Sequence, residues 1–207
     1  MTLYTFTNME TITIGGIEWS TANSSNIEMK NGGVVPVART MEEWQTFCLN
    51  KQLCCCAYDF DEKNVAKFGY LYNAYVLAEA DNFTPDGFRI PSRNDWNNLL
   101  DALGGNISID KNTPSPCLPK LKATKGWLGK MNGTNESGFN ALPGGDLFIG
   151  KEFRDKGYGV NWWTIEFNEP HITQYDKNKF KFHDTGAEIF NGPKGAMSGN
   201  YIRLIRS

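Results

Sequence analysis

The sequence predicts a single domain of the α+β class, which combines strands, helices and long structured loops. Segments with alternating polar and apolar residues lie near both ends and indicate a strand at each end. Two stretches in the first half combine a helix cap with helical apolar spacing. The 207 residues show no repeat, linker or low-complexity run, so we expect an N-terminal arm (residues 1–11) followed by one domain (residues 12–207).

The first element expected is a β-hairpin. Residues 12–14 and 17–19 alternate with a period of two around Gly15 and Gly16, and such a glycine pair suits a tight turn with positive φ angles. Residues 201–206 alternate in the same way near the end of the chain and predict the last strand.

Two helices are indicated by capping patterns. Thr40 and Glu43 form a capping-box pattern ahead of Trp44 and Phe47, which predicts a short helix to about Asn50. The second helix begins at Ser92, has Asp95 in its first turn and ends before Gly104 and Gly105. Its apolar face follows the i, i+3, i+4, i+7 pattern through Trp96, Leu99, Leu100 and Leu103.

The remaining segments give weaker signals. Residues 70–80 contain no glycine or proline and favour a helix, although their aromatic residues leave a strand open. Residues 126–159 are rich in glycine and asparagine, and residues 162–199 mix aromatic residues with short polar turns. Both stretches are expected to form long structured loops.

The charge distribution argues against nucleic acid as a partner. The formal net charge is −2, and lysine and arginine are spread along the chain rather than gathered in blocks. No stretch approaches the roughly 20 apolar residues that span a bilayer, so membrane insertion is not expected. Residues 1–14 lack the basic start, apolar block and cleavage site of a secretory leader, so either export is not encoded or a leader was removed.

The cysteines are expected to be buried free thiols. The chain has five of them, and Cys54, Cys55 and Cys56 are adjacent, so in a strand they cannot all face one metal ion. Free thiols agree with synthesis in a reducing compartment. A disulfide between Cys48 and Cys117 is an open alternative that no sequence feature supports.

Motifs for common enzyme chemistry are incomplete. Residues 145–151 match the first seven positions of a phosphate-binding loop, but Glu152 stands where a serine or threonine must bind magnesium. The segment is therefore interpreted as a glycine-rich surface turn. Ser198 lacks the preceding glycine of a nucleophile elbow, and the two histidines, His171 and His183, do not have the spacing of a zinc site.

Signals for calcium and sugar binding are also partial. Residues 59–64 resemble a calcium loop, but Lys63 occupies a ligand position, so a solvated acidic turn is preferred. Residues 168–170 contain the Glu, Pro and Asn of a lectin calcium motif in scrambled order. Trp162 and Trp163 could stack on sugars, but neighbours in a strand face opposite ways, and both are interpreted mainly as core residues. No cofactor or metal is predicted.

Several ordered segments together resemble a known family. They are Ile14–Trp19, Gly69–Tyr75, Pro85–Pro91 with Trp96, Leu121–Lys122, Gly126–Trp127, Asn135–Gly145, Trp162–Thr164 and Ile202–Arg206. In this order they are similar to the Fibrobacter succinogenes major paralogous domain, and the resemblance covers about residues 12–206. The block from Asn135 to Gly145 is its most specific part.

The resemblance implies a C-type-lectin-like fold, distantly related to the formylglycine-generating enzymes. Such a fold brings the first and last strands together and carries ligand-binding residues on the long loops before the last strand. The related enzymes use paired cysteines late in the chain, whereas the last cysteine here is Cys117, so catalysis of that type is not expected. Many members of the family are exported surface proteins of gut-type bacteria.

The function expected is that of a non-catalytic binding or display module. We expect a bacteriophage virion protein or a bacterial surface protein that recognises a cell-surface glycan or protein. The alternative is a structural virion decoration or adaptor protein that contacts other virion proteins. In either case we expect the protein on a virion or at the extracellular surface. Whether it forms a homo-oligomer is left open. This expectation rests on analogy, since a fold alone does not fix a function.

The candidate ligand-binding residues lie in the late segment, residues 166–197. The best candidates have polar or amphipathic side chains in a stretch too polar to form core: His171, Tyr175, Lys177, Lys179 and His183. Tyrosine offers a large contact area at low entropic cost, and exposed lysines meet acidic groups on a partner.

Overall fold

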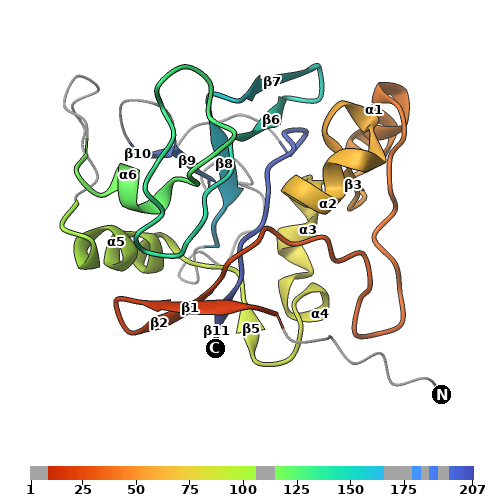
Figure 1. Cartoon of the computed structure of the whole chain (residues 1–207). Helices are drawn as coiled ribbons and strands as arrows, with labels where there is room; N and C mark the ends of the chain where they lie inside the picture. Colours follow the sequence, from red (N-terminus) through yellow and green to blue (C-terminus); the bar gives the residue numbers. More distant parts are fainter. Residues whose placement is uncertain (1–8, 106–114, 166–178, 183–186, 191–195) are drawn as a thin grey trace.

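The computed structural model describes residues 9–105, 115–165, 179–182, 187–190 and 196–207, with backbone alone at 179–182 and 187–190. In Figure 1, α1 to α4 lie on one side of the central strands, and α5 and α6 lie on the other. The helices are α1 (Met41–Leu49), α2 (Val65–Phe68), α3 (Tyr75–Ala78), α4 (Ala80–Phe83), α5 (Arg93–Ala102) and α6 (Leu118–Leu121), with 3-10 turns η1 (Tyr58–Phe60) and η2 (Glu62–Asn64).

The strands form three small sheets. They are β1 (Thr11–Ile14), β2 (Ile17–Ser20), β3 (Cys55–Cys56), β4 (Leu71–Tyr72), β5 (Phe88–Arg89), β6 (Gly144–Phe148), β7 (Glu152–Lys156), β8 (Val160–Trp163), β9 (Lys179–Phe182), β10 (Ala187–Phe190) and β11 (Ile205–Arg206). The sheet orders are β1-β2-β11-β5, β10-β9-β8-β6-β7 and β3-β4. Among the strand pairs of the described chain, β6 with β8 is the only parallel one. The arrangement is of the α+β class, as predicted.

The N-terminal hairpin and the last strand lie in one sheet, with β2 beside β11. The predicted hairpin forms: β1 pairs with β2 in antiparallel register, and Gly15 and Gly16 have φ angles of 61° and 81°. In β11, Ile205 pairs with Trp19 on one side and with Arg89 on the other. The strand predicted over residues 201–206 is shorter than expected, because its pairing with β2 and β5 is confined to Ile205 and Arg206.

The residues just before β11 join other strands. Gly199 forms a bridge with Leu147, Asn200 with Tyr72, and Tyr201 with Trp162. The end of the chain therefore connects all three sheets. Because both faces of this segment are covered, Tyr201 to Ile205 are buried without alternation, including Arg203.

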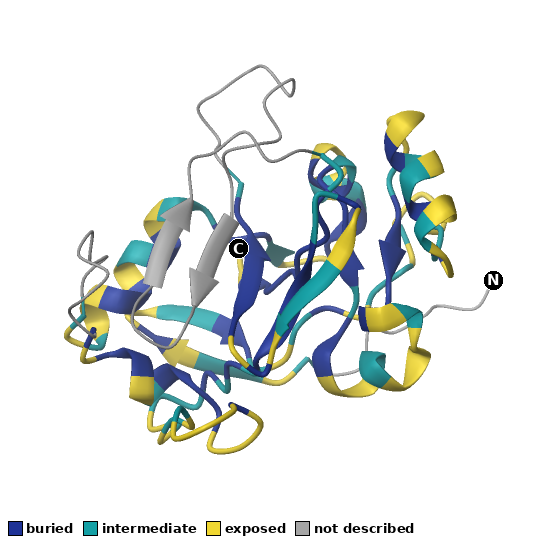
Figure 2. Cartoon of the chain, turned by 90° about the horizontal axis from the view of Figure 1, so that it is seen from above, coloured by how far each residue is buried: buried dark blue, intermediate teal, exposed yellow. Residues whose placement is uncertain are grey.

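An aromatic cluster forms the larger part of the core. The rings of Trp19 and Trp96 lie 4.8 Å apart between centroids, and those of Trp96 and Trp162 lie 5.4 Å apart. Phe139 makes edge contacts with the same rings. Trp163 packs on the opposite face of β8, in a second cluster with Tyr72. Trp162 and Trp163 are both buried, which confirms their interpretation as core residues. In Figure 2 the central strands are coloured dark blue, for buried.

The two capped helices form as predicted. Thr40 caps α1 by accepting a hydrogen bond from the backbone N–H of Glu43, while the Glu43 carboxylate accepts from the N–H of Arg39 instead of closing the box. Ser92 and Asp95 make the complete capping box of α5, which ends at Ala102. Local cap chemistry is sufficient to place both helix starts.

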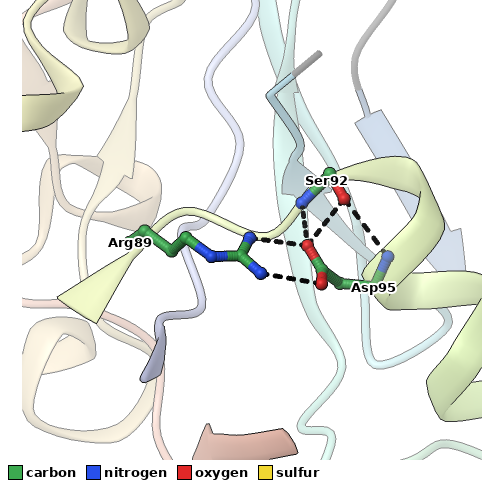
Figure 3. A network of polar contacts seen from close by, with 3 residues as sticks. All are labelled: Arg89, Ser92 and Asp95. Atoms are coloured by element: carbon green, nitrogen blue, oxygen red, sulfur yellow. Dashed lines mark hydrogen bonds and ion pairs between the residues drawn. The ribbon is translucent and has the colours of Figure 1, made fainter. Parts of the chain in front are cut away.

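Arg89 from β5 links this cap to the sheet that contains β1, β2, β11 and β5 (Figure 3). Its guanidinium donates two hydrogen bonds to the Asp95 carboxylate, at 2.6 and 2.8 Å. The same carboxylate accepts from the Ser92 backbone N–H at 2.7 Å and from the Ser92 hydroxyl at 2.6 Å. Burial alone would raise the pKa of Asp95, but these hydrogen bonds outweigh it and hold the pKa below its ordinary value.

Several segments differ from the prediction. Residues 70–80 contain both a strand and a helix, β4 followed by α3. The stretch 126–159, expected to be loop, contains β6 and β7, and the stretch 162–199 contains the end of β8 and the β9–β10 hairpin. These strands are only four or five residues long, and their pairing depends on contacts beyond the local sequence, so even the alternation of β9 was too short a signal to place a strand.

All five cysteines are free and buried, as expected. The alternative disulfide between Cys48 and Cys117 is not formed. In β3, Cys56 points into the aromatic core cluster and Cys55 into the cluster of Trp163, which confirms that the triplet does not face one ligand.

Candidate functional site

Most of the predicted site residues lie outside the described part of the chain. These are His171, Tyr175, Lys177 and His183. Lys179 is the first residue of β9, and its backbone pairs with Trp163 of β8 and Phe190 of β10. The segment that contains these residues therefore includes a hairpin added to the edge of the large sheet, rather than loop alone.

The described ends of this late segment lie on one platform. Ile165 donates a backbone hydrogen bond to Pro91, and Ala196 accepts one from Ala74. Ile165 and Ala196 both pack against the core cluster that contains Trp163. Residues 165 and 196 are thus both anchored to this core cluster. That the late segment contacts a ligand stays a prediction.

A pocket of about 500 Å³ lies at the end of β2. Its rim is the segment Ser20–Glu28, which leaves β2 and turns toward the α4–β5 connection. The opposite walls are formed by residues from three other parts of the chain: Met9, Glu10, Pro85 and Leu204. Segments distant in sequence therefore converge on one concave surface, which makes this pocket the candidate binding site.

Asn23 anchors the middle of the rim to the core. Its Nδ2 donates to the backbone carbonyl of Phe68 at 2.7 Å. Its Oδ1 accepts from Trp162 Nε1 at 2.8 Å and from Arg203 Nε at 2.9 Å. One side chain thus connects the rim to α2, β8 and the C-terminal segment.

Asn26 and Ser24 fix the second half of the rim. Asn26 Nδ2 donates to the carbonyls of Glu28 and Phe83, at 2.8 and 2.9 Å. Its Oδ1 accepts from the Glu28 backbone N–H at 3.0 Å. The buried Tyr72 hydroxyl approaches Ser24 Oγ at 3.3 Å and donates to the Asn26 carbonyl at 2.8 Å. The rim is held by side chains before any ligand arrives.

A buried arginine supports the pocket from beneath. Arg203 is 1% exposed and donates to the carbonyls of Ser20, Phe139 and Asn140, at 2.6, 2.9 and 3.2 Å. Burial lowers its pKa to about 9, so the guanidinium remains charged at neutral pH. Its charge is satisfied by uncharged oxygens of the rim and the Phe139–Asn140 turn, which couples the start of the rim to the aromatic core.

The groups that face solvent around this rim are mostly neutral or acidic. Ser25, Glu10 and Glu28 are exposed, while Pro85 and Leu204 supply a buried apolar wall. Hydroxyl groups, backbone carbonyls and carboxylates accept hydrogen bonds, so the lining suits a ligand rich in O–H or N–H donors. The lining residues of the described chain include two carboxylates, Glu10 and Glu28, but no lysine or arginine. The pocket would therefore repel phosphate or another anion.

Sequence reasoning missed this pocket. The run Ser20–Asn26 is rich in serine and asparagine, which is an ordinary loop composition. The signal that distinguishes it is the set of hydrogen bonds to Phe68, Trp162 and Arg203, and these partners are distant in sequence. No single-sequence pattern reports such contacts.

The other motifs have structural roles. Residues 145–151 run from β6 through a tight turn, and β7 begins at Glu152, so no helix N-terminus follows the glycine-rich stretch. The interpretation as a surface turn is wrong for its first part, because Gly145 and Asp146 are buried in β6. Ser198 is buried and accepts from the Ile149 N–H at 3.3 Å.

In the acidic turn at residues 59–64, the Asp61 side chain caps the 3-10 turn η2. Asp61 Oδ1 accepts from the Lys63 backbone N–H at 3.0 Å, and Asp59, Asp61 and Glu62 are exposed. Within the described ranges no three acidic, histidine or cysteine side chains gather as ligands for a metal ion. The described helices are also too short or too polar to cross a membrane.

The comparison with protein families gives a match over almost the whole chain. The model of the Fibrobacter succinogenes major domain matches residues 12–206. The chain belongs to the Fibrobacter succinogenes major domain family. The match begins in β1 and ends in β11, so the whole pocket except Met9 and Glu10 lies within the family domain. No curated protein and no solved structure matches the chain.

Proposed function

We propose that this chain is a non-catalytic recognition module with a C-type-lectin-like fold, and that it binds a cell-surface glycan. The observation that carries the proposal is the pocket at the end of β2, whose rim is held in place by Asn23, Asn26 and Arg203. A rim fixed in advance loses little conformational entropy when a ligand binds.

The lectin-like arrangement is supported by the order of the sheets. The N-terminal hairpin and the C-terminal strand share one sheet, while a second sheet carries the late β9–β10 hairpin. The family resemblance implies the first of these features, together with ligand-binding residues on the long loops before the last strand. In this proposal the late segment, which includes β9 and β10, provides a second contact surface that is separate from the pocket.

A glycan fits the lining better than an acidic ligand does. Sugar hydroxyls donate hydrogen bonds to carboxylates, and Glu10 and Glu28 offer two carboxylates at exposed positions of the pocket. The apolar wall of Pro85 and Leu204 can cover the C–H surface of a sugar ring. A protein partner rich in lysine or in amide donors is the second ligand class with matching chemistry.

A glycan array tests this proposal. The wild-type chain is compared with the variant Glu10→Gln/Glu28→Gln, which keeps side-chain size and removes two charged acceptors. We expect the variant to lose about tenfold or more in affinity, because a hydrogen bond to a charged group contributes about 1.5–3 kcal/mol.

A matched control separates the pocket from general charge effects. Glu136→Gln/Glu152→Gln changes two exposed glutamates that do not line the pocket. Equal losses in both double variants, or unchanged binding by the pocket variant, would contradict the assignment of the pocket.

We propose that the module acts on a bacteriophage virion or on a bacterial surface. A structural adaptor of a virion is the second candidate, and it would bury exposed apolar side chains in its subunit contacts. Val34 is 59%, Leu49 75% and Tyr158 55% exposed, and an assembly would cover such groups. Cross-linking within purified particles tests this alternative. If the chain is an adaptor, these three residues should cross-link to other particle proteins; if it is a receptor binder, they should not.

A further inference from the structure

Two buried cysteines meet at the end of α1. Cys48 lies in the last turn of the helix, and the chain reverses at Lys51, which has a φ angle of 56°. A hydrogen bond from the Gln52 N–H to the Phe47 carbonyl, 2.8 Å long, closes this reversal. The chain then runs back past the helix end, and Cys54 returns to the side of Cys48.

Asn73 binds both sulfur atoms with one amide group. Its Nδ2 lies 3.2 Å from the Cys54 sulfur and 3.6 Å from the Cys48 sulfur, and it also donates to the Gln52 carbonyl at 2.8 Å. Its Oδ1 accepts from the Cys54 backbone N–H at 3.1 Å. A single buried side chain therefore holds the two thiols beside each other and fixes the backbone of one of them.

The two thiols differ in acidity. The pKa of Cys48 lies below its ordinary value, because the neighbouring Cys54 thiol and the Asn73 amide stabilise its thiolate more than burial disfavours it. The pKa of Cys54 is raised, first by the neighbouring Cys48 sulfur and then by burial. Such a pair has an attacking sulfur, Cys48, and a neighbouring thiol that can resolve the product.

We propose that Cys48 and Cys54 form an oxidisable thiol pair, which a peroxide converts to an intramolecular disulfide. The Cys48 thiolate attacks one oxygen of hydrogen peroxide, the O–O bond breaks, and a sulfenic acid and hydroxide form. The Cys54 sulfur then attacks the Cys48 sulfur and releases its oxygen as water. In total, two thiols and one peroxide give one disulfide and two water molecules.

The surroundings make Cys48 the entry point. It is 3% exposed, whereas Cys54 is fully buried, and the next residue, Leu49, is 75% exposed. Cys48 belongs to the core cluster but lies at the end of α1, so fraying of the last turn is the shortest route by which its sulfur reaches solvent. Cys117, by comparison, lies 3.1 Å from Ser115 Oγ, and burial raises its pKa.

The test uses the whole wild-type chain and hydrogen peroxide as the probe. We expect limited oxidation to lower the mass of the chain by about 2 Da, for the two hydrogen atoms lost. Thiol titration after denaturation is expected to find three of the five cysteines, and dithiothreitol to restore all five. A tryptic fragment that ends at Lys51 should be linked to the next fragment, which ends at Lys63.

Single substitutions assign the second sulfur, since the fragment that ends at Lys63 contains Cys54, Cys55 and Cys56. The linked fragments should persist in Cys55→Ser, Cys56→Ser and Cys117→Ser and disappear in Cys54→Ser. If Cys54→Ser does not fold, sequencing of the linked wild-type fragments identifies the same bond. No linked fragment in the wild type, or a link from Cys48 to Cys56, would overturn the proposal.

Discussion

Among the single residues, Asp95 combines a helix cap with a link between α5 and β5. Its carboxylate receives hydrogen bonds from Arg89 and from Ser92, and its side chain is 8% exposed. We expect Asp95→Asn to lower the free energy of unfolding by about 1–2 kcal/mol at pH 7, near the low end for such pairs because Arg89 keeps contact with water. Urea denaturation measures this loss.

The pH dependence gives a second test of the same residue. The pKa of Asp95 is lower in the folded chain than in the unfolded one, so its contribution is complete above about pH 4 and is lost as the pH falls through the folded-state pKa. The stability difference between wild type and Asp95→Asn should therefore shrink below about pH 4. A constant difference from pH 7 to pH 3 would show that the charge of Asp95 does not stabilise the fold.

Arg203 is a buried charge with a structural task. Replacing it by methionine leaves the carbonyls of Ser20, Phe139 and Asn140 without donors, so we expect a loss of about 3 kcal/mol or more in the free energy of unfolding. Arg206→Met is the matched control, because the Arg206 side chain is 51% exposed and pairs with Glu18 only at the surface. The control should cost less than about 1 kcal/mol by the same denaturation measurement.

At the scale of elements, α5 depends on Trp96. The side chain is fully buried between Trp19, Phe139 and Trp162, so Trp96→Ala is expected to cost about 3–5 kcal/mol through the cavity it leaves. Asn98→Ala, at an exposed position of the same helix, controls for helix propensity. A free energy of unfolding for Trp96→Ala within about 1 kcal/mol of wild type would place the helix outside the core.

Close packing around the glycines of β6 explains the two glycines that end the Asn135–Gly145 block. Gly145 has a φ angle of 76°, and a Cβ there would collide with the Arg154 carbonyl and lie 2.7 Å from the Tyr58 ring. We expect Gly145→Ala to lower the free energy of unfolding by about 3 kcal/mol or more. Gly16→Ala has the same kind of φ angle, 81°, but open space around it, so a cost of only about 1 kcal/mol is expected.

The two kinds of element differ in how far the sequence predicts them. The starts of α1 and α5 were predictable because Thr40 and Ser92 act on backbone groups three residues away. Strand β6 was not, because its residues pair with β7, β8 and Gly199 and carry glycine where close packing requires it. The pocket rim was missed for the same reason: its composition is local, but Asn23 binds partners far along the chain.

For the molecule as a whole, the contributions of the late segment and of the pocket to ligand binding can be tested separately. If residues 166–197 also contact the ligand, the double variant Tyr175→Ala/Lys177→Ala should weaken binding while circular dichroism shows an unchanged fold. If both side chains are among the interface residues that cost more than about 1 kcal/mol when truncated, a loss of about tenfold or more in affinity is expected. Unchanged binding would remove this face from the site and leave the pocket unaffected.

The central claim is that the pocket at the end of β2 binds the ligand. The most direct measurement is a titration of the ¹⁵N-labelled chain, followed by NMR, with the sugar that binds best on the array. The account predicts that the largest amide shifts fall in residues 20–28, with smaller ones at Glu10 and Leu204. Shifts confined to residues outside this pocket, with those of 20–28 unmoved at saturation, would contradict it.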